Sequence, residues 1–184
     1  MTRILGAVLA GGEARRFGSD KALAEIGGER LIARAIATLA PQCDEVVVCG
    51  RTWPRVRSLA DRPYRGLGPL GGLAAALALA LEEGFDAVLS MPCDVPDPPR
   101  DLIGRLMPAP ALLEACPVIG LWPAGLSIAL DRHLAEGGGR SMRGWGAACG
   151  AREVALDRPL ANINRPADLA AFLARPGREG GHDC

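Results

Sequence analysis

Short apolar runs alternate with stretches of helical periodicity in the first half of the chain. The three strongest runs are residues 3–10 (RILGAVLA), 44–50 (DEVVVCG) and 85–94 (FDAVLSMPCD). Such nearly continuous apolar runs are typical of strands buried on both faces of a parallel sheet. Helices are predicted between them, over residues 28–41 and from about Pro69 to Gly84. The alternation predicts an α/β fold, a single Rossmann-like domain with a mostly parallel sheet and helices on both faces.

Glycine and proline interrupt the second half more often, and its elements are less regular. We interpret residues 110–123 and 126–130 (LSIAL) as strands and residues 131–137 and 140–150 as helices. Residues 152–156 are predicted as a late strand. A terminal helix is predicted from Arg165, with Pro166 in its first turn. We expect one domain over residues 1–175 and a disordered tail over residues 176–184.

Composition and charge exclude several classes of protein. The 184 residues are 49% hydrophobic, enough for one sizeable core. The 21 basic and 21 acidic side chains create no overall positive field, which argues against nucleic acid and anionic membranes as partners. The six cysteines form no CxxC pair, and no apolar run reaches the roughly 18 residues of a membrane span. We therefore expect a reduced, soluble, cytoplasmic protein, and a monomer because no heptad pattern is present.

The loop after the first predicted strand, AGGEARRFGSDK, combines glycines with cations. Gly11 and Gly12 lack a Cβ, so their backbone amides can approach a phosphate closely. Arg15, Arg16 and Lys21 then supply positive charge. The spacing matches neither the P-loop GxxxxGK[ST] nor the dinucleotide-binding GxGxxG. An ordinary glycine-rich turn with a solvated charge cluster remains the alternative.

The loop after the third predicted strand, PCDVPDPP, carries two carboxylates. Asp94 follows a buried strand directly, at the edge of the sheet where ligands bind in α/β proteins. One or two carboxylates together with substrate phosphates commonly hold Mg²⁺. Asp94 is therefore our candidate metal ligand. Its alternative role is to cap the following helix, which Asp97, nearer to that helix, could do more naturally.

Other polar and aromatic residues have functional and structural interpretations. Asp61 precedes a GPLGG turn at residues 68–72 that could serve a ligand or simply close helix packing. Trp122 and Trp145 could stack on a ring, although most tryptophans are packing residues. We interpret Asn164 as a cap of the terminal helix, leave Asn162 open as a possible ligand contact, and interpret His133 as a solvated helix residue.

Four motifs together resemble one family over nearly the whole chain. LAGGEARRFGSDKAL, GPLGGL, PCDVPDPP and NINRPADL stand in the order and approximate spacing of the molybdenum cofactor guanylyltransferases, members of the nucleotidyltransferase superfamily with a Rossmann-like sheet. The resemblance implies transfer of GMP from Mg²⁺-bound GTP to the phosphate of molybdenum-molybdopterin, which forms the guanine dinucleotide cofactor and releases pyrophosphate. It also implies contacts with molybdopterin-handling proteins and molybdoenzymes.

The resemblance assigns roles to the matching positions. The guanine nucleotide would be wrapped by Leu9, Ala10, Gly11 and Gly12, and Asp61 would help to bind the nucleoside. Lys21 would contact the phosphates and, together with Arg16, would stabilise the leaving pyrophosphate. Asp94 would hold Mg²⁺. Cys49 stands where family members have a nucleotide-contacting asparagine. The alternatives within this enzyme class are a cytidylyltransferase or a sugar-phosphate nucleotidyltransferase. Outside it, the alternative is a non-catalytic nucleotide-binding or cofactor-handover protein.

Overall fold

The computed structural model describes residues 2–11, 21–163 and 165–174. The strands and helices in chain order are β1 (Ile4–Leu9), the 3-10 helix η1 (Lys21–Leu23), β2 (Glu25–Ile26), β3 (Glu29–Arg30), α1 (Leu31–Leu39), β4 (Glu45–Cys49), β5 (Arg57–Leu59), α2 (Pro69–Glu82), β6 (Ala87–Pro92), α3 (Leu102–Leu106), β7 (Ala111–Leu113), β8 (Cys116–Pro123), the 3-10 helix η2 (Ala124–Leu126), α4 (Ser127–Ala135), α5 (Met142–Ala148), β9 (Arg152–Val154) and α6 (Pro166–Leu173).

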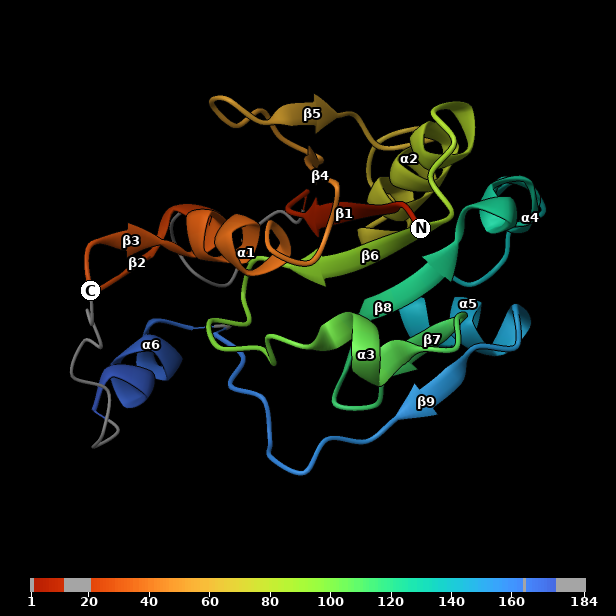
Figure 1. Cartoon of the computed structure of the whole chain (residues 1–184). Helices are drawn as coiled ribbons and strands as arrows, with labels where there is room; N and C mark the ends of the chain where they lie inside the picture. Colours follow the sequence, from red (N-terminus) through yellow and green to blue (C-terminus); the bar gives the residue numbers. More distant parts are fainter. Residues whose placement is uncertain (1, 12–20, 164, 175–184) are drawn as a thin grey trace.

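A seven-stranded sheet forms the centre of the molecule (Figure 1). Its strand order is β5-β4-β1-β6-β8-β7-β9, and β8 alone runs against its neighbours within this sheet. β2 and β3 form a separate small hairpin. The predicted single α/β domain with a mostly parallel sheet is thus confirmed.

Helices cover both faces of the sheet, because successive side chains of a buried strand point to opposite sides. On one face, Val8 of β1 belongs to a core with Ile32 of α1 and Leu102 of α3. On the other face, Leu5 and its neighbours pack with α2, α4 and α5. In Figure 1, α1 and α3 are drawn in front of the sheet and α2 behind it.

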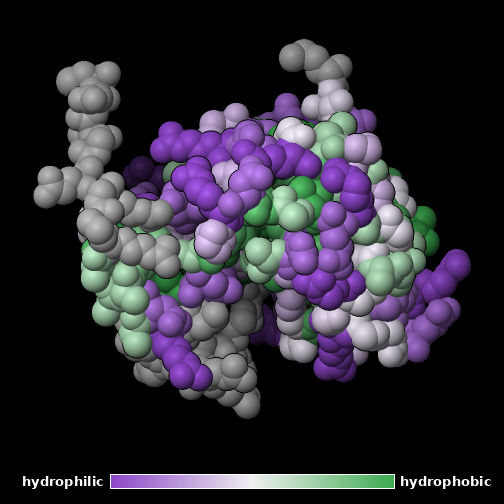
Figure 2. Space-filling model, turned by 90° about the horizontal axis from the view of Figure 1, so that it is seen from below, coloured by the Kyte–Doolittle hydropathy of each residue, from purple (hydrophilic) through white to green (hydrophobic). Residues whose placement is uncertain are grey.

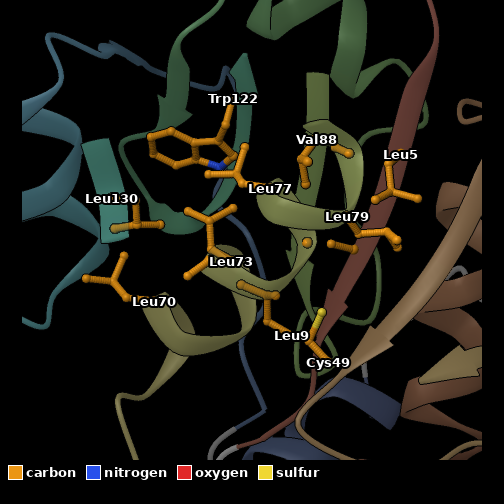
Figure 3. Packing of buried hydrophobic residues seen from close by; sticks show 14 of the residues in the cluster. Leu5, Leu9, Cys49, Leu70, Leu73, Leu77, Leu79, Val88, Trp122 and Leu130 are labelled. Atoms are coloured by element: carbon orange, nitrogen blue, oxygen red, sulfur yellow. The ribbon is translucent and has the colours of Figure 1, made fainter. Parts of the chain in front are cut away.

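α2 is the central helix of the second core, and its sequence explains its burial. Every residue from Leu70 to Ala80 is buried, so the helix is apolar on all sides rather than on one stripe. Leucines at helical spacing, among them Leu73 and Leu77, lie toward Trp122 of β8 and Leu130 of α4 (Figure 3). The small alanines between them allow the helix to approach the sheet closely.

The LSIAL stretch was predicted as a strand, and this prediction is wrong. These residues form the end of η2 and the first turn of α4, which continues through Ala135. Ser127, Leu130 and Leu134 are buried, whereas Ile128 is 66% exposed. The buried positions therefore follow a helical period, and the apolar run concealed it because Ile128 points away from the core.

α6 packs against the hairpin at the opposite end of the molecule from α4 (Figure 1). Ile163 and Phe172 are buried in a small cluster with Ile26 and Leu31. Pro166 occupies the first turn as predicted, and the N-cap is Arg165, whose backbone N–H donates to the Asp168 carboxylate at 2.8 Å. Asn164, expected as the cap, and the tail over residues 176–184 lie outside the described residues.

The surface of the protein is mixed in character. Figure 2 shows the side on which β9 and α3 lie, and hydrophilic residues there surround a strip of hydrophobic ones. Within the described ranges, the helices are all too short or too polar to cross a membrane. The cysteines in these ranges form no disulfide bond with one another.

Candidate active site

The four parallel strands β5, β4, β1 and β6 end at one edge of the sheet. Leu9 of β1 pairs with Cys49 of β4 on one side and with Pro92 of β6 on the other. Cys49 in turn pairs with Leu59 of β5. The segments that follow these strands therefore emerge side by side, as expected for the ligand-binding edge of an open α/β sheet.

Gly11 and Gly50 approach each other at this edge. Gly50 has a φ of +86°, and a side chain there would collide with the backbone of Gly11. A Cβ added to Gly11 would lie 3.1 Å from the Cα of Gly50 and 3.5 Å from Oδ1 of Asp61. Only glycine permits this approach, so the two loops leave backbone and the Asp61 carboxylate at the surface of the site.

The Asp61 carboxyl group lies in a partly buried, mixed environment. Burial raises its pKa above the ordinary value, while a hydrogen bond from the backbone N–H of Gly66 and the charge of Arg65 act in the opposite direction. Burial, followed by the nearby charge of Asp61, raises the pKa of the Cys49 thiol to about 12. Cys49 is therefore a neutral thiol at physiological pH.

Two adjoining cavities open at this edge and share Gly11, Asp61 and Gly68. The larger measures about 650 Å³, and the smaller about 180 Å³. The larger is lined by Gly11, Gly50, Arg51, Thr52, Ser58, Leu59, Ala60, Asp61, Arg65, Gly66 and Gly68. The smaller is lined by Leu9, Gly11, Cys49, Asp61, Gly68, Pro69, Gly72, Pro92 and Val118. Together they offer a polar compartment with two arginines beside an apolar slot, in the size range of small-molecule sites.

Arg51 and Arg65 line the site, and the sequence had not singled them out. Arg51 follows Gly50 and donates from Nε to the carbonyl oxygen of Ala10 at 3.2 Å. Arg65 is close enough to Asp61 to affect its pKa. The signal for Arg51 was its place directly after a predicted strand. Arg65 carries no such signal, because a long loop brings it to the site.

The GPLGG turn combines the two roles that the sequence left open. A Cβ at Gly71 would lie 3.0 Å from Cβ of Asp61, and one at Gly72 would lie 2.9 Å from Cβ of Cys49. The glycines thus allow close packing of α2 on the sheet. Gly72 also lines the smaller cavity beside Cys49 and Leu9, whose side chains lie together in Figure 3.

Asp94 lies two residues beyond β6 and is half-buried. Its backbone carbonyl accepts a hydrogen bond of 2.9 Å from the N–H of Ile163, but Asp94 lines neither of the two cavities. The prediction that Asp97 caps the next helix is wrong, because α3 begins at Leu102 with Asp101 as its N-cap residue. Asp97 lies four residues before this N-cap, in the turns that precede α3.

Asp94 is the candidate donor for a metal ion at this edge of the sheet. Among the described residues, no three His, Cys, Asp or Glu side chains cluster to form a metal site. Asp94 at the carboxyl end of a strand fits Mg²⁺, which is often held by one or two carboxylates and completed by substrate phosphates and water. It does not fit a structural zinc centre, which needs several protein ligands.

The remaining candidates divide into packing residues and residues not described. Gly12, Arg15 and Arg16 lie outside the described residues, and of Lys21 only the backbone, at the start of η1, is described. Trp122 and Trp145 are buried packing residues rather than stacking surfaces. His133 is half-buried, contrary to the expected solvated position, with its ring 5.3 Å from that of Trp145. Asn162 is exposed.

Comparisons with known proteins identify the family. The MobA-like NTP transferase domain matches residues 6–149. The chain is 38% identical to the molybdenum cofactor guanylyltransferase of Acidiphilium cryptum, covering 91% of this chain and 92% of the relative. It is 37% identical to the protein of that name from Rhodobacter capsulatus, covering 91% and 94%.

Solved structures share the fold at low sequence identity. The molybdopterin-guanine dinucleotide biosynthesis protein A of Archaeoglobus fulgidus superimposes with a TM-score of 0.70 at 20% identity, covering 91% of this chain and 95% of the other. The 2-C-methyl-D-erythritol 4-phosphate cytidylyltransferase of Thermus thermophilus gives 0.61 at 20% identity, covering 95% and 98%. The sequence matches over most of the chain show that it belongs to the family of MobA-like NTP transferases.

Proposed function

We propose that this protein transfers GMP from GTP to the phosphate of molybdenum-molybdopterin, forming molybdopterin guanine dinucleotide and releasing pyrophosphate. The observation that carries the proposal is the full-length similarity to molybdenum cofactor guanylyltransferases. The site supports it, because Gly11 of the first motif and Gly68 of the GPLGGL motif line both cavities together with Asp61.

In this proposal the paired cavities hold the nucleoside and the start of its phosphate chain. The Asp61 carboxylate accepts hydrogen bonds, and guanine and ribose both offer donors. Gly11 and Gly50 allow the two loops to approach each other, and both line the larger cavity, where a base or a sugar would lie against their backbone. The arginines at positions 51 and 65 add positive potential to a compartment that receives a polyanion.

The chemistry needs positioning and charge neutralisation more than an activated side chain. The acceptor phosphate is already ionised near neutral pH and attacks the α-phosphorus of GTP; the bond from that phosphorus to the leaving pyrophosphate breaks as the new bond forms. Lys21 and Arg16 are proposed to stabilise the negative charge on the departing pyrophosphate. The neutral Cys49 thiol takes no part as a nucleophile, because burial keeps it protonated.

Asp94 is the proposed ligand of Mg²⁺, which would supply Lewis-acid polarisation of the phosphate oxygens. Asp94 sits on the segment that follows β6, where Ile163 holds its backbone. This bond fixes the backbone from which the Asp94 carboxylate projects. We further propose that the protein acts as a monomer in the cytoplasm and delivers its product to molybdopterin-handling proteins or molybdoenzymes.

The deciding experiment measures pyrophosphate release by the purified protein with Mg²⁺ and molybdenum-loaded molybdopterin. Parallel reactions contain GTP, CTP or ATP, and a further reaction omits the acceptor. We expect release with GTP that requires the acceptor. Release with CTP alone would reassign the protein as a cytidylyltransferase. No release from folded protein that binds GTP would instead support a nucleotide-binding or handover role.

A further inference from the structure

A third cavity lies at the same edge of the sheet, outside the site described above. It measures about 520 Å³ and lies between the segment from Asp97 to Asp101 with Arg105 of α3, and the segment from Leu156 to Leu160 after β9. β9 is parallel to β7, which shares its direction with β6 because both run antiparallel to β8. The carboxyl ends of β6 and β9 therefore face the same edge, where α/β proteins bind ligands.

The walls of this cavity combine both signs of charge with apolar surface. They contain three carboxylates, three guanidinium groups, and proline and leucine side chains: Asp97, Asp101, Asp157, Arg100, Arg105, Arg158, Pro98, Pro99, Pro159, Leu156 and Leu160. In Figure 1 the segment after β9 runs along the bottom of the molecule, on the side shown in Figure 2. A cavity with balanced charge is unsuited to a polyanion and suited to a ligand that both donates and accepts hydrogen bonds.

Two of these charged side chains form an ion pair with each other, and the remaining ones line the cavity. Nε of Arg105 lies 2.7 Å from Oδ1 of Asp101, so these two groups hold each other. Among the described residues, Arg100 and Arg158 form no ion pair. Arg100, Asp157 and Arg158 are all exposed. These three side chains offer polar groups to a ligand, with prolines beside them.

A pterin ring matches this arrangement. Its amino-oxo-pyrimidine edge presents two adjacent N–H donors and a carbonyl acceptor, which a carboxylate and a guanidinium group can satisfy together. The ring can stack on a guanidinium plane and pack against the proline side chains. The cavity volume lies within the roughly 300 to 1,000 Å³ of small-molecule sites.

Both walls of the cavity lead back to Asp94. The segment from Asp97 to Asp101 begins three residues after Asp94. The other wall continues from Leu160 to Ile163, whose N–H donates to the Asp94 carbonyl at 2.9 Å. A molecule with its ring in the cavity and a phosphate on a short linker can therefore extend toward the proposed metal ligand. The hydrogen-bonding groups of the cavity and its position beside Asp94 therefore both fit a pterin that carries a phosphate.

We propose that the cavity between Asp97–Asp101 and Leu156–Leu160 binds the pterin ring of the acceptor, with Asp157 accepting from its N–H groups and Arg158 donating to its carbonyl. This inference rests on the proposed function, which supplies the pterin as acceptor. It assigns the acceptor to a compartment separate from the cavities around Asp61.

Binding is tested first with a fluorescent probe, pterin-6-carboxylate, titrated into the full-length protein without nucleotide. We expect the protein to quench the probe, and we expect Asp157→Asn and Arg158→Ala each to weaken binding at least about tenfold, since each removes a hydrogen bond to a charged group. The matched control is Arg132→Ala, an exposed arginine of α4, which should bind like the wild type. Unfolding temperature and GTP affinity, unchanged in all variants, show that the fold is intact.

The kinetic arm measures the KM for molybdenum-loaded molybdopterin and for GTP separately. We expect Asp157→Asn and Arg158→Ala to raise the first KM and to leave the second unchanged. Absence of wild-type quenching, or wild-type probe affinity in both variants, overturns the assignment of this cavity. If the wild type quenches the probe but releases no pyrophosphate, the proposed function fails while the pterin site is still judged by the binding data.

Discussion

Arg51 holds the carbonyl of Ala10 through a 3.2 Å hydrogen bond from Nε, and so connects the segments that follow β4 and β1. Ala10 is also fixed through its own N–H, which donates to the carbonyl of Cys49 at 3.0 Å. The residue before Gly11 is therefore bound through both backbone polar groups. This arrangement fixes the entry to the proposed nucleotide loop before a ligand binds.

Replacing Arg51 with lysine is expected to weaken GTP binding more than it slows the chemical step. Lysine keeps the charge but has no Nε–H in the position of the guanidinium group, so the Ala10 carbonyl loses its donor. We expect the KM for GTP to rise about three- to tenfold, corresponding to a net hydrogen bond of roughly 0.5 to 1.5 kcal/mol. Arg55→Lys, in the same loop but exposed, is the control. Equal KM values for GTP in both variants would show that the hydrogen bond from Arg51 to Ala10 does not contribute to binding.

GTP affinity is expected to fall on mild acidification because of Asp61. Burial raises the pKa of this carboxyl group, so it takes up a proton at a higher pH than an ordinary aspartate with a pKa of 3.8. Only the ionised form accepts two N–H donors, so binding strengthens as pH rises through the shifted pKa. Calorimetric titration of GTP between about pH 4 and pH 7 measures the effect. Asp61→Asn should bind weakly with a flatter profile, whereas an unchanged slope would assign the dependence to the nucleotide.

The same pKa shift has an opposite consequence for stability. Because the folded-state pKa lies above the ordinary value, the folded protein holds this proton more tightly than the unfolded chain does. The stabilising contribution is complete below pH 3.8 and is lost as pH rises through the folded-state pKa. Denaturant unfolding of the ligand-free proteins measures this effect. As pH rises above 3.8, the free energy of unfolding of the wild type should fall relative to that of Asp61→Asn. A relative rise would contradict the sign of the shift.

Gly72→Ala is expected to destabilise the fold and to close the smaller cavity. The new Cβ would lie 2.9 Å from Cβ of Cys49 and 3.1 Å from Cδ2 of Leu9, both of which are buried. Overpacking of this kind costs about 1 to 3 kcal/mol. Gly104→Ala in α3 is the matched control, because its Cβ meets nothing within 4 Å and helix propensity favours alanine by roughly 0.5 to 1 kcal/mol. Similar stability of the two variants would show that α2 moves away without cost.

Ser90 satisfies the indole of Trp122 in the core. Trp122 donates from Nε1 to Oγ of Ser90 at 2.9 Å, and this hydroxyl donates to the carbonyl of Val118 at 2.7 Å. Ser90→Ala should lower the free energy of unfolding by about 1 to 3 kcal/mol, because the indole N–H and the carbonyl lose their partner in a dry environment. In the Ser90→Ala background, Trp122→Phe should cost less than in the wild type. Additive costs in this double-mutant cycle would exclude the coupling.

Asp94→Asn is expected to reduce turnover by about a hundredfold or more while GTP still binds. The amide keeps the shape of the side chain but loses the charge that Mg²⁺ requires, and one preorganised electrostatic contact is worth about 10²- to 10³-fold in rate. Steady-state pyrophosphate release over a Mg²⁺ titration provides the measurement. Glu136→Gln, which removes an exposed carboxylate after α4, should leave the rate unchanged. Wild-type turnover in Asp94→Asn would remove this residue from the mechanism.

The buried parallel strands and the helices between them were predictable because their signal is local. β1 and β6 are buried on both faces and β4 is buried over its last three residues, so their apolar runs are nearly continuous. The first turn of α4 was predicted as a strand because Ile128 adds an apolar side chain to the exposed face of the helix. Short stretches with one misplaced apolar residue do not distinguish the two periods.

The site was predictable in its strand ends and not in the contacts between them. Position after a strand indicated Gly11 and Asp94, since topology alone brings such residues to one edge. The proximity of Arg65 to Asp61, and the third cavity between Asp97 and Asp157, depend on how loops fold back across the sheet. Loop conformation is set by contacts distant in sequence, which carry no periodicity to detect.

The bond between Ile163 and Asp94 has a consequence for the order of events during protein synthesis. Ile163 follows all the strands of the sheet along the chain, whereas Asp94 comes directly after β6. A ribosome therefore produces the complete framework of the sheet before it produces the N–H that holds the Asp94 carbonyl. A chain that ends before Ile163 would contain every strand of the sheet and still lack this anchor for the segment that follows β6.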